Sequence, residues 1–271
     1  MKHLKFLAAV CCMAAVFAAC EKNEPSDNTN GNGINTDQNG GNSNTDNSSG
    51  SVSAPTGTEN GHGYVDLGLS VKWATCNVGA TKPEEYGNYY AWGETEPKDY
   101  YDWSTYKYGS YDELTKYCTD SDYGKDGFAD YKTVLELADD AAHVNWGGAW
   151  RMPTDAEWKE LIDNCTYTWT DDYNGTGVSG GIVTGLNGNS IFLPAAGYRD
   201  HGDLNIAGPS GYYYGGYWSS SLNTYRPNYA DGPSYAWCVS IEPGDAPHLF
   251  LGCVGRRYDD RCYGLSVRPV L

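Results

Sequence analysis

Apolar and polar residues alternate along the chain from residue 65 onwards. The large apolar side chains occupy every second position at Val65, Leu67, Leu69, Val71 and Trp73. This period of two is typical of a strand that buries one face. Gly68 interrupts the run and predicts a tight bend or a bulge. We therefore expect a bent strand over residues 65–73.

Two later segments have the spacing of amphipathic helices. The first begins after Pro153, where Thr154 and Glu157 have the positions of a capping box. Apolar residues then follow at helical intervals: Trp158, Leu161, Ile162 and Cys165. The second covers residues 131–142, and its apolar face is formed by Val134, Leu137, Ala138 and Ala141. Both patterns predict a helix with one buried side.

Beyond Asn174 the helical spacing stops. Short apolar runs, separated by turns rich in Gly and Asn, occur at residues 181–184, 190–193, 236–241, 248–251 and 264–270. Such runs predict short strands joined in hairpins. Helices followed by many short strands are typical of an α+β domain with long loops, and not of alternating βαβ units.

The first residues have the pattern of an export signal. Lys2 and Lys5 precede an apolar run over residues 6–19, which is too short to span a bilayer. The run ends in small residues directly before Cys20, which resembles the lipobox of bacterial lipoproteins. We expect residues 1–19 to be a cleaved signal peptide and Cys20 to carry lipid. The alternative is an ordinary secretory signal with Cys20 free or paired.

Residues 20–60 contain mostly Asn, Gly, Ser, Thr and Asp after the cysteine. A segment of this composition buries too little apolar surface to offset its ordering entropy, so it predicts a disordered stalk. Its typical reach is about 35 Å. Residues 61–271 are richer in aromatic and aliphatic side chains and are long enough for one domain.

The charge of the chain narrows its possible partners. The formal net charge is −17 at pH 7, and it becomes more negative when Lys2 and Lys5 leave with the signal. Such a surface repels nucleic acid and anionic lipid. We expect no nucleic-acid partner and contact with the membrane only through the lipid anchor, which leaves cations and neutral ligands such as sugars as the easier partners.

No catalytic or metal-binding pattern is present in the sequence. Residues 175–181 match G-x-G-x-x-G and G-x-S-x-G, but residues 171–174 (DDYN) directly precede them and a short β-like run follows in place of a helix, so a hairpin loop is favoured. The nearest approach to an EF-hand loop starts at Asp122 and has Thr133 in place of the last Glu. The thiols of the domain have no C-x-x-C spacing and are expected to be structural or free: Cys76, Cys118, Cys165, Cys238, Cys253 and Cys262. We predict no enzyme activity and no cofactor, with a calcium site of another architecture as the alternative.

Tyrosine and tryptophan are unusually frequent, with 24 Tyr and 9 Trp against 5 Phe. Both side chains combine an apolar face with a polar group, so they suit binding surfaces as well as cores. Residues 212–218 (YYYGGYW) cannot all point to one side of a strand. We therefore expect some of them to be exposed, and mutual packing of these rings is the alternative.

Four ordered motifs carry a family resemblance. They are residues 64–80 (YVDLGLSVKWATCNVGA), 146–154 (WGGAWRMPT), 217–221 (YWSSS) and 264–270 (GLSVRPV). With them, residues 61–271 resemble the Fibrobacter succinogenes major paralogous domain, which is abundant in lipoproteins of gut Bacteroidetes. Residues 150–158 (WRMPTDAEW) are also similar to a segment of formylglycine-generating enzymes. The resemblance implies a C-type lectin-like fold, with the capped helix packed on a twisted antiparallel sheet.

The same fold displays variable residues in proteins that retroelements diversify, and residues 220–263 resemble such a region. This resemblance implies a ligand-binding face formed by Tyr225, Arg226, Asn228, Tyr229, Asp231, His248, Arg256, Arg257, Tyr258, Asp259, Asp260 and Arg261. It implies a scaffold role for Trp218, Trp237 and Val267. Loop drift within a paralogous family is the alternative explanation of the irregular segment.

The leading functional hypothesis is an outer-membrane lipoprotein, exposed at the cell surface as an adhesin or receptor, that binds a glycan or a protein. The second is a structural or fimbria-associated surface subunit without a discrete ligand pocket. The third is an oxidase similar to formylglycine-generating enzymes. Those enzymes bind copper through a closely spaced cysteine pair, whereas Cys253 and Cys262 are nine positions apart.

Overall fold

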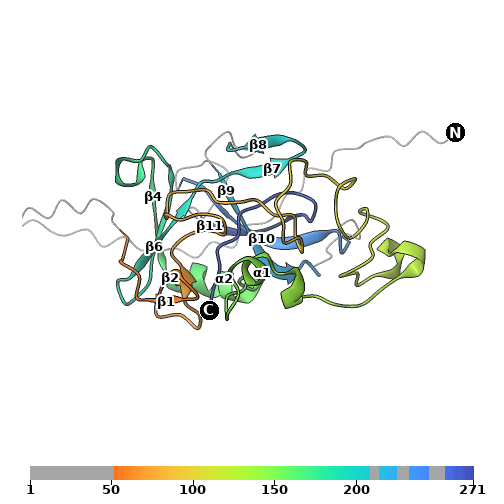
Figure 1. Cartoon of the computed structure of the whole chain (residues 1–271), viewed down its shortest axis with the longest axis horizontal. Helices are drawn as coiled ribbons and strands as arrows, with labels where there is room; N and C mark the ends of the chain where they lie inside the picture. The colour runs from red at the N-terminus through yellow and green to blue at the C-terminus, as the bar shows by residue number, and fades with distance from the viewer. Residues whose placement is uncertain (1–51, 208–213, 225–231, 244–253) are drawn as a thin grey trace, which may run out of the picture. The chain divides into compact units, whose positions relative to one another are not determined.

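The computed structural model describes residues 52–207, 214–224, 232–243 and 254–271 (Figure 1). Residues 52–60, whose composition predicts a stalk, belong to the folded structure. Strand β1 (Gly57–Glu59) pairs with β2 (His62–Val65). Ser53 N–H donates to the carbonyl of Ser190 at 3.2 Å. The folded part therefore begins earlier than residue 61.

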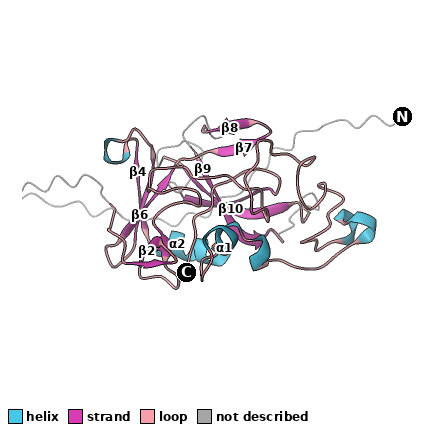
Figure 2. Cartoon of the chain, viewed as in Figure 1, coloured by secondary structure: helices cyan, strands magenta, loops and turns pink. Residues whose placement is uncertain are grey.

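The strands are short and their pairings are antiparallel (Figure 2). One sheet has the order β1-β2-β3, where β3 is Trp73–Ala74. A second sheet has the order β4-β5-β6, with bounds Thr166–Thr170, Gly180–Thr184 and Ser190–Pro194. β7 and β8 form a two-stranded sheet, Tyr198–Asp200 and Asp203–Asn205. The last sheet has the order β11-β10-β9, with bounds Val254–Asp260, Tyr235–Ile241 and Gly215–Leu222.

This arrangement is α+β, as predicted. β5, β6 and β10 confirm the strands expected near 181–184, 190–193 and 236–241, and the loop over 175–180 joins two paired strands. The run at 248–251 lies outside the described residues. The strand expected over 65–73 is interrupted, because β2 ends at Val65 and β3 begins at Trp73. Gly68, with φ of 77°, makes the predicted bend. Between β2 and β3, the alternation of apolar and polar residues reflects which side chains are buried, and no strand forms there.

The capped helix is confirmed as α2 (Asp155–Asn164). The Thr154 hydroxyl accepts from Glu157 N–H at 3.2 Å, and the Glu157 carboxylate accepts from Thr154 N–H at 2.7 Å. Trp158 and Leu161 are buried on its inner face. The capping box therefore fixes where the helix starts, and the apolar face fixes how it packs.

The helix predicted over 131–142 is wrong. The chain instead forms a 3-10 turn, Leu137–Asp139, and a short helix α1, Ala141–Trp146. Before them, Leu135 N–H donates to the carbonyl of Ser220 at 2.9 Å, and Val134 forms a bridge with Ser221. Pairing with β9 satisfies the backbone of this segment, so helical hydrogen bonds are not needed there. Asp140 then caps α1 by accepting from His143 N–H at 3.0 Å. The remaining 3-10 turns are Ser121–Tyr123, Lys125–Gly127 and Tyr173–Gly175.

Strand β9 lies between the two hydrophobic clusters of the described residues. Tyr217 packs in the cluster that contains Trp158 of α2, whereas Trp218 packs in the cluster that contains Trp92 and Trp150. Both faces of β9 are therefore covered. Tyr214, Tyr217 and Trp218 are buried, so the expectation that some aromatic residues of 212–218 are exposed stays a prediction for the other two. Tyr212 and Tyr213 lie outside the described residues.

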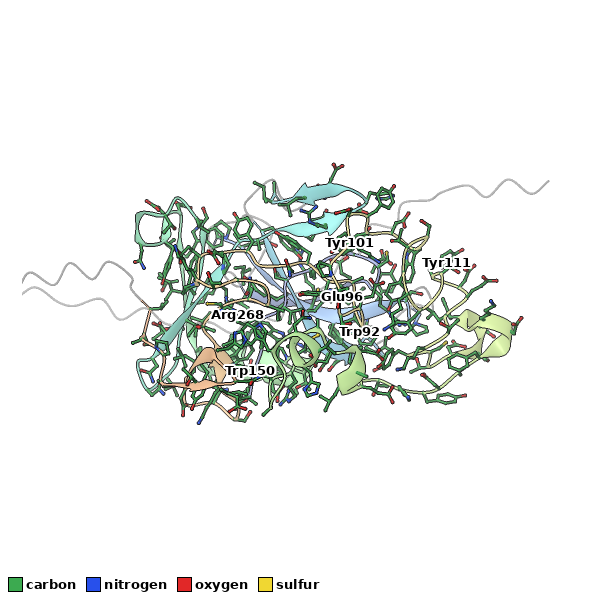
Figure 3. The ribbon with its side chains drawn as sticks, viewed as in Figure 1. Trp92, Glu96, Tyr101, Tyr111, Trp150 and Arg268 are labelled. Atoms are coloured by element: carbon green, nitrogen blue, oxygen red, sulfur yellow. The ribbon has the colours of Figure 1, made fainter. Side chains whose placement is uncertain are left out.

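The segment expected as a strand over 264–270 runs through the core and makes isolated bridges. Val270 bridges both Trp73 and Arg151. Arg268, which is labelled in Figure 3, has no exposed surface. Its guanidinium donates to the side chain of Asn77 at 2.9 Å, the carbonyl of Ala74 at 3.0 Å and the carbonyl of Phe192 at 2.9 Å. This single side chain therefore connects segments that are far apart in sequence.

Candidate binding site at strand β11

Strand β11 forms one edge of its sheet. It pairs with β10 in the register Cys238↔Arg257 and Trp237↔Tyr258, and it has no second strand neighbour among the described residues. Successive side chains of a strand point to opposite faces. Arg256 and Tyr258 therefore share one face and are exposed, while Arg257 and Asp259 share the other and are half-buried.

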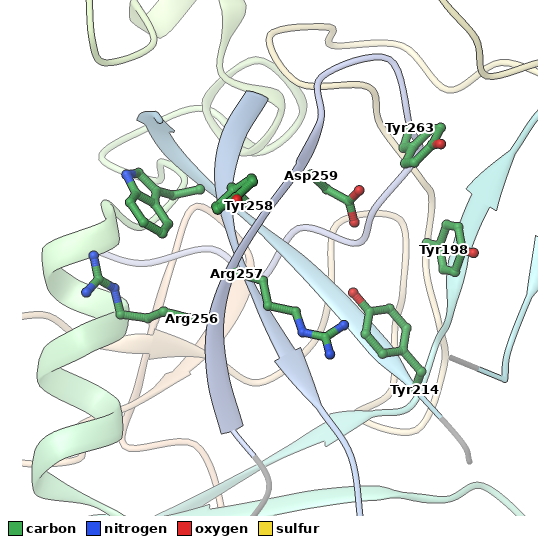
Figure 4. A pocket seen from close by; sticks show the side chains of 8 residues that line it. Tyr198, Tyr214, Arg256, Arg257, Tyr258, Asp259 and Tyr263 are labelled. Carbon is green, nitrogen blue, oxygen red and sulfur yellow. The ribbon is translucent and has the colours of Figure 1, made fainter. Parts of the chain in front are cut away.

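A cavity of about 450 Å³ surrounds this edge. Its lining residues are Tyr198, Tyr214, Trp237, Arg256, Arg257, Tyr258, Asp259 and Tyr263. In Figure 4, Arg257 and Asp259 project from β11 toward three tyrosines, whereas Arg256 projects to the opposite side. The cavity therefore has two parts, one on each face of the strand.

The first part, which we call the tyrosine cleft, is formed by Tyr198, Tyr214, Tyr263, Arg257 and Asp259. The ring centroids of Tyr198 and Tyr214 are 5.8 Å apart in an edge-on arrangement, and those of Tyr198 and Tyr263 are 6.0 Å apart. The Arg257 guanidinium lies 5.8 Å from the Tyr214 ring centroid and 3.5 Å from the buried carboxylate of Glu242. Burial raises the pKa of all three phenols, so they are neutral hydroxyl groups at physiological pH.

The second part lies beside α2. The Arg256 guanidinium is 4.7 Å from the Trp237 ring centroid, and its Nε donates to Asp155 at 2.7 Å. A second nitrogen of Arg256 bonds the other oxygen of Asp155. Tyr258 packs edge-on against Trp237 with centroids 5.9 Å apart. Trp237 was expected in the scaffold, but it is only half-buried and lines the cavity.

Two adjacent carboxyl groups end the strand. The pKa of Asp259 is raised to about 6 by burial and by the neighbouring charges of Asp260 and Asp200. The pKa of Asp260 is also raised to about 6, mainly by burial and in addition by Asp200. Among the described residues neither carboxylate forms an ion pair within 4 Å. Arg257 offsets part of the charge of Asp259, and a hydrogen bond from Trp103 stabilises ionised Asp260, but burial outweighs both effects.

We expect the substitution Asp259→Asn to raise the free energy of unfolding at pH 8 by about 1 kcal/mol, after allowance for solvent screening. The folded-state pKa lies above the ordinary value, so the ionised carboxyl opposes folding at high pH. This penalty fades as pH falls through 6 and vanishes below the ordinary pKa. Urea denaturation at pH 8 and pH 4 measures the difference, with Asp163→Asn as the exposed control. An equal gain in the free energy of unfolding at both pH values would contradict the raised pKa of Asp259.

The structure brings together four of the predicted binding residues, Arg256, Arg257, Tyr258 and Asp259, and places Asp260 at the end of the same strand. The other predicted positions lie outside the described residues: Cys20, Tyr225, Arg226, Asn228, Tyr229, Asp231 and His248. Trp218 and Val267 are fully buried, which is consistent with the scaffold role predicted for them.

Arg261 does not belong to this face, contrary to the prediction. It has no exposed surface, because the strand ends at Asp260 and the next side chain turns into the core. Its guanidinium lies 4.8 Å from the Trp92 ring centroid. It donates to the Tyr106 hydroxyl and to main-chain carbonyls of Tyr117, Pro233 and Lys116, at distances of 2.9, 3.1, 2.9 and 3.1 Å.

None of the three tyrosines of the cleft was predicted as a binding residue, although Tyr214 lies in the aromatic run 212–218. Tyr198 is in β7, Tyr214 precedes β9 and Tyr263 follows β11. Their spacing has no motif, and the general excess of tyrosine does not distinguish them from the tyrosines of the core. Only the fold brings them together.

No family model, curated protein or solved structure matches this chain. The resemblance to the major paralogous domain family therefore stays a prediction. Among the described residues, no three His, Cys, Asp or Glu side chains are grouped so that they could hold a metal ion. No helix within the described ranges is long and apolar enough to cross a membrane. The thiols of Cys76, Cys118, Cys165, Cys238 and Cys262 are free, and Cys253 lies outside the described residues.

Proposed function

We propose that this chain is a surface lipoprotein, anchored through Cys20, that binds a neutral glycan in the tyrosine cleft. We further propose that its domain has a C-type lectin-like fold. Antiparallel sheets, two short helices and long loops support the fold, as does the packing of α2 against the cluster that contains Tyr217. The family resemblance supports the anchor and the surface location.

The observation that carries the functional proposal is the composition of the tyrosine cleft. Three aromatic rings, one guanidinium and one carboxylate line this part of the cavity. Aromatic faces pack against the C–H groups of sugar rings, and a few convergent polar groups fix the orientation of a ligand in an otherwise apolar cleft. The whole cavity, of which the tyrosine cleft is one part, has a volume of about 450 Å³, which falls within the range of small-molecule sites.

The charges of the site favour a neutral ligand. Arg257 is compensated by Glu242, and Arg256 is compensated by Asp155. Both cations are therefore committed, while the chain as a whole is strongly negative. An anionic glycan would meet long-range repulsion without a free cation to offset it.

Oxidase chemistry of the formylglycine-generating type is not supported by the surroundings of Cys262. This thiol is fully buried, and burial raises its pKa. Copper is bound by the thiolate, which such an environment disfavours. Cys253, the other cysteine of the predicted pair, lies outside the described residues.

The variants Tyr198→Ala and Arg257→Ala are each expected to weaken glycan binding by about tenfold or more, because each removes a contact at the centre of the site. A glycan array identifies the ligand, and calorimetry then measures affinity for each variant. Tyr131→Ala is the matched control, since Tyr131 is 71% exposed and does not line the cavity.

Two outcomes would contradict the proposal. If no glycan binds, a structural surface subunit without a ligand pocket becomes the better explanation. If a glycan binds with equal affinity to the wild type and both cleft variants, its site lies elsewhere on the chain.

A further inference from the structure

Tyr214 differs from three other fully buried tyrosines in the surroundings of its hydroxyl group. Tyr101, Tyr117 and Tyr217 each donate their hydroxyl to an acceptor of the protein, at distances of 2.7, 2.7 and 2.6 Å. The side chain of Tyr214 is only 2% exposed, yet its hydroxyl has no hydrogen-bond partner among the described residues. A buried hydroxyl without a partner is costly. This group therefore indicates a ligand.

The hydroxyl of Tyr214 is directed into the tyrosine cleft. In Figure 4 it points from the ring toward β11, between the side chains of Arg257 and Asp259. The carboxylate of Asp259 projects into the same cavity. The one hydrogen bond that it accepts within the described residues comes from the N–H of Asp260, at 3.2 Å. The cleft therefore offers a ligand one buried donor and one strong acceptor.

A hydroxyl group of a ligand can satisfy both side chains at once. It carries one donor and two acceptor lone pairs, so it can accept from the Tyr214 phenol and donate to the Asp259 carboxylate. An ether oxygen lacks the donor, and an anionic group would meet the carboxylate as a like charge. Arg257 cannot offset that repulsion, because Glu242 already compensates it. A neutral sugar, which presents several hydroxyl groups, has the required chemistry.

We propose that Tyr214 and Asp259 recognise one free hydroxyl group of the bound glycan, which accepts a hydrogen bond from the phenol and donates one to the carboxylate. This inference rests on the proposed function, because it concerns the same cleft. It limits the ligands to sugars in which that hydroxyl is unsubstituted. It also makes binding sensitive to acid, because a protonated carboxyl is a poorer acceptor than a carboxylate.

Protonation of Asp259 weakens this contact near pH 6. The pKa of the carboxyl is raised to about 6, mainly by burial and also by the charges of Asp260 and Asp200. A glycan that donates to the carboxylate favours its ionised form, and charge-assisted hydrogen bonds are stronger than neutral ones. Affinity is therefore complete well above pH 6 and declines as pH falls through 6.

Most groups around Asp259 keep their charge over the same range. Burial raises the pKa values of the three phenols of the cleft and of the Cys238 thiol in the neighbouring strand β10. These groups stay neutral between pH 5 and pH 8, and Arg257 stays cationic throughout. A change in affinity over this range therefore does not come from them.

Three neighbouring groups can still change the local charge. The pKa of Asp260 is raised to about 6, mainly by burial, and Asp200 of β7 lies 2.7 Å from a ring nitrogen of His201. Successive side chains of a strand point to opposite faces, so Asp260 faces away from Asp259 and accepts from Trp103 instead. Variants at Asp260 and Asp200 therefore separate the effects of these groups from that of Asp259.

Ligand-observed NMR titration of the full chain tests the proposal, with Cys20→Ser in every protein to remove the proposed lipid site. The probes are the methyl glycosides of glucose, galactose and mannose. The wild type is expected to bind at least one of them about tenfold more tightly at pH 8 than at pH 5. Tyr214→Phe and Asp259→Asn are each expected to lose about tenfold in affinity at pH 8, and Asp259→Asn should bind equally at both pH values.

The controls are Asp260→Asn and Asp200→Asn, which should keep the affinity at pH 8 and most of the difference between the two pH values. Both test variants are expected to fold. Phe at position 214 omits only a hydroxyl that has no partner among the described residues, and Asn at position 259 removes a buried charge. Thermal denaturation checks that each variant is folded at the titration temperature.

Monodeoxy analogues of the glycoside that binds identify the recognised hydroxyl. Removal of that hydroxyl is expected to weaken binding to the wild type by about tenfold or more. It should have little effect on the double variant Tyr214→Phe/Asp259→Asn, because both protein partners of the hydroxyl are already absent. Removal of any other hydroxyl should affect the wild type and the double variant equally.

The outcomes separate this inference from the proposed function. If none of the three glycosides binds the wild type, the inference is overturned, and the glycan array decides the proposed function separately. If a glycoside binds the wild type and both single variants equally, or equally at both pH values, the inference alone is overturned. Tyr198→Ala and Arg257→Ala then still show whether the glycan occupies the tyrosine cleft.

Discussion

Replacement of Arg261 by Met is expected to lower the free energy of unfolding by about 4 kcal/mol, or to prevent folding altogether. The substitution leaves the main-chain carbonyls of Lys116, Tyr117 and Pro233 without the donor that they have in the wild type. Each buried acceptor without a partner costs about 1–3 kcal/mol. Met also fails to fill the planar space beside Trp92. Urea denaturation followed by tryptophan fluorescence measures the loss.

Arg256→Met is the matched control, because Arg256 is exposed and lies on the same segment. This variant should lose less than about 1 kcal/mol in the free energy of unfolding, as is usual for surface ion pairs. Arg261→Lys should fall between the two, since a lysine keeps the charge but not the fork of donors. Equal stability of the Arg261 and Arg256 variants would disprove the role of Arg261 as a connector of the core.

Asp139→Asn is expected to cost about 3 kcal/mol at pH 7. Although burial opposes its ionisation, hydrogen bonds from Lys116, Tyr108, Tyr117 and Lys107 hold the pKa of Asp139 well below its usual range. The Tyr117 hydroxyl donates at 2.7 Å, and the Lys107 ammonium donates at 3.2 Å. In the Asn variant, an amide nitrogen replaces one carboxylate oxygen. This nitrogen is itself a hydrogen-bond donor, so it cannot accept from the tyrosine and lysine donors that surround it.

This carboxylate also predicts acid lability. Its folded-state pKa is depressed, so its stabilisation is complete above the ordinary pKa of an aspartate and is lost as pH falls below about 4. The wild type should therefore lose stability in this range, and the Asp139→Asn variant should show a shallower decline. Denaturation midpoints between pH 2 and pH 7 measure the slope. Asp163→Asn, which removes an exposed pair with Lys159, should leave the slope unchanged.

The sequence analysis succeeded for the elements whose formation depends on residues close together in the chain. The capping box at Thr154 located α2, and short apolar runs between glycines located β5, β6 and β10. The helix predicted over residues 131–142 does not form, because part of this segment pairs with β9 instead. That pairing joins residues far apart in sequence. Tertiary pairing overrides helix propensity in such cases.

The tyrosines show why the site was only partly predictable. Much of the described region between β3 and α1 has no regular structure, and its carbonyl groups need donors. Tyr101 donates to the carbonyl of Tyr89 at 2.7 Å, and Tyr106 donates to the carbonyl of Trp92 at 2.7 Å. Buried aromatic residues in this core are therefore tyrosines and not phenylalanines where a hydroxyl is needed to donate to a main-chain carbonyl. The excess of tyrosine could not by itself indicate which rings form a binding site, although the charged residues of β11 could be identified as a group.

The bridges of residues 265–270 determine when this domain can fold. Leu265 and Val267 complete one hydrophobic cluster and Val270 completes the other, while Arg268 satisfies carbonyls of β3 and β6. During synthesis from the amino end, neither cluster is complete until residues 265–270 have been made. On the proposed export route, the chain would therefore lack a complete core until residues 265–270 are present.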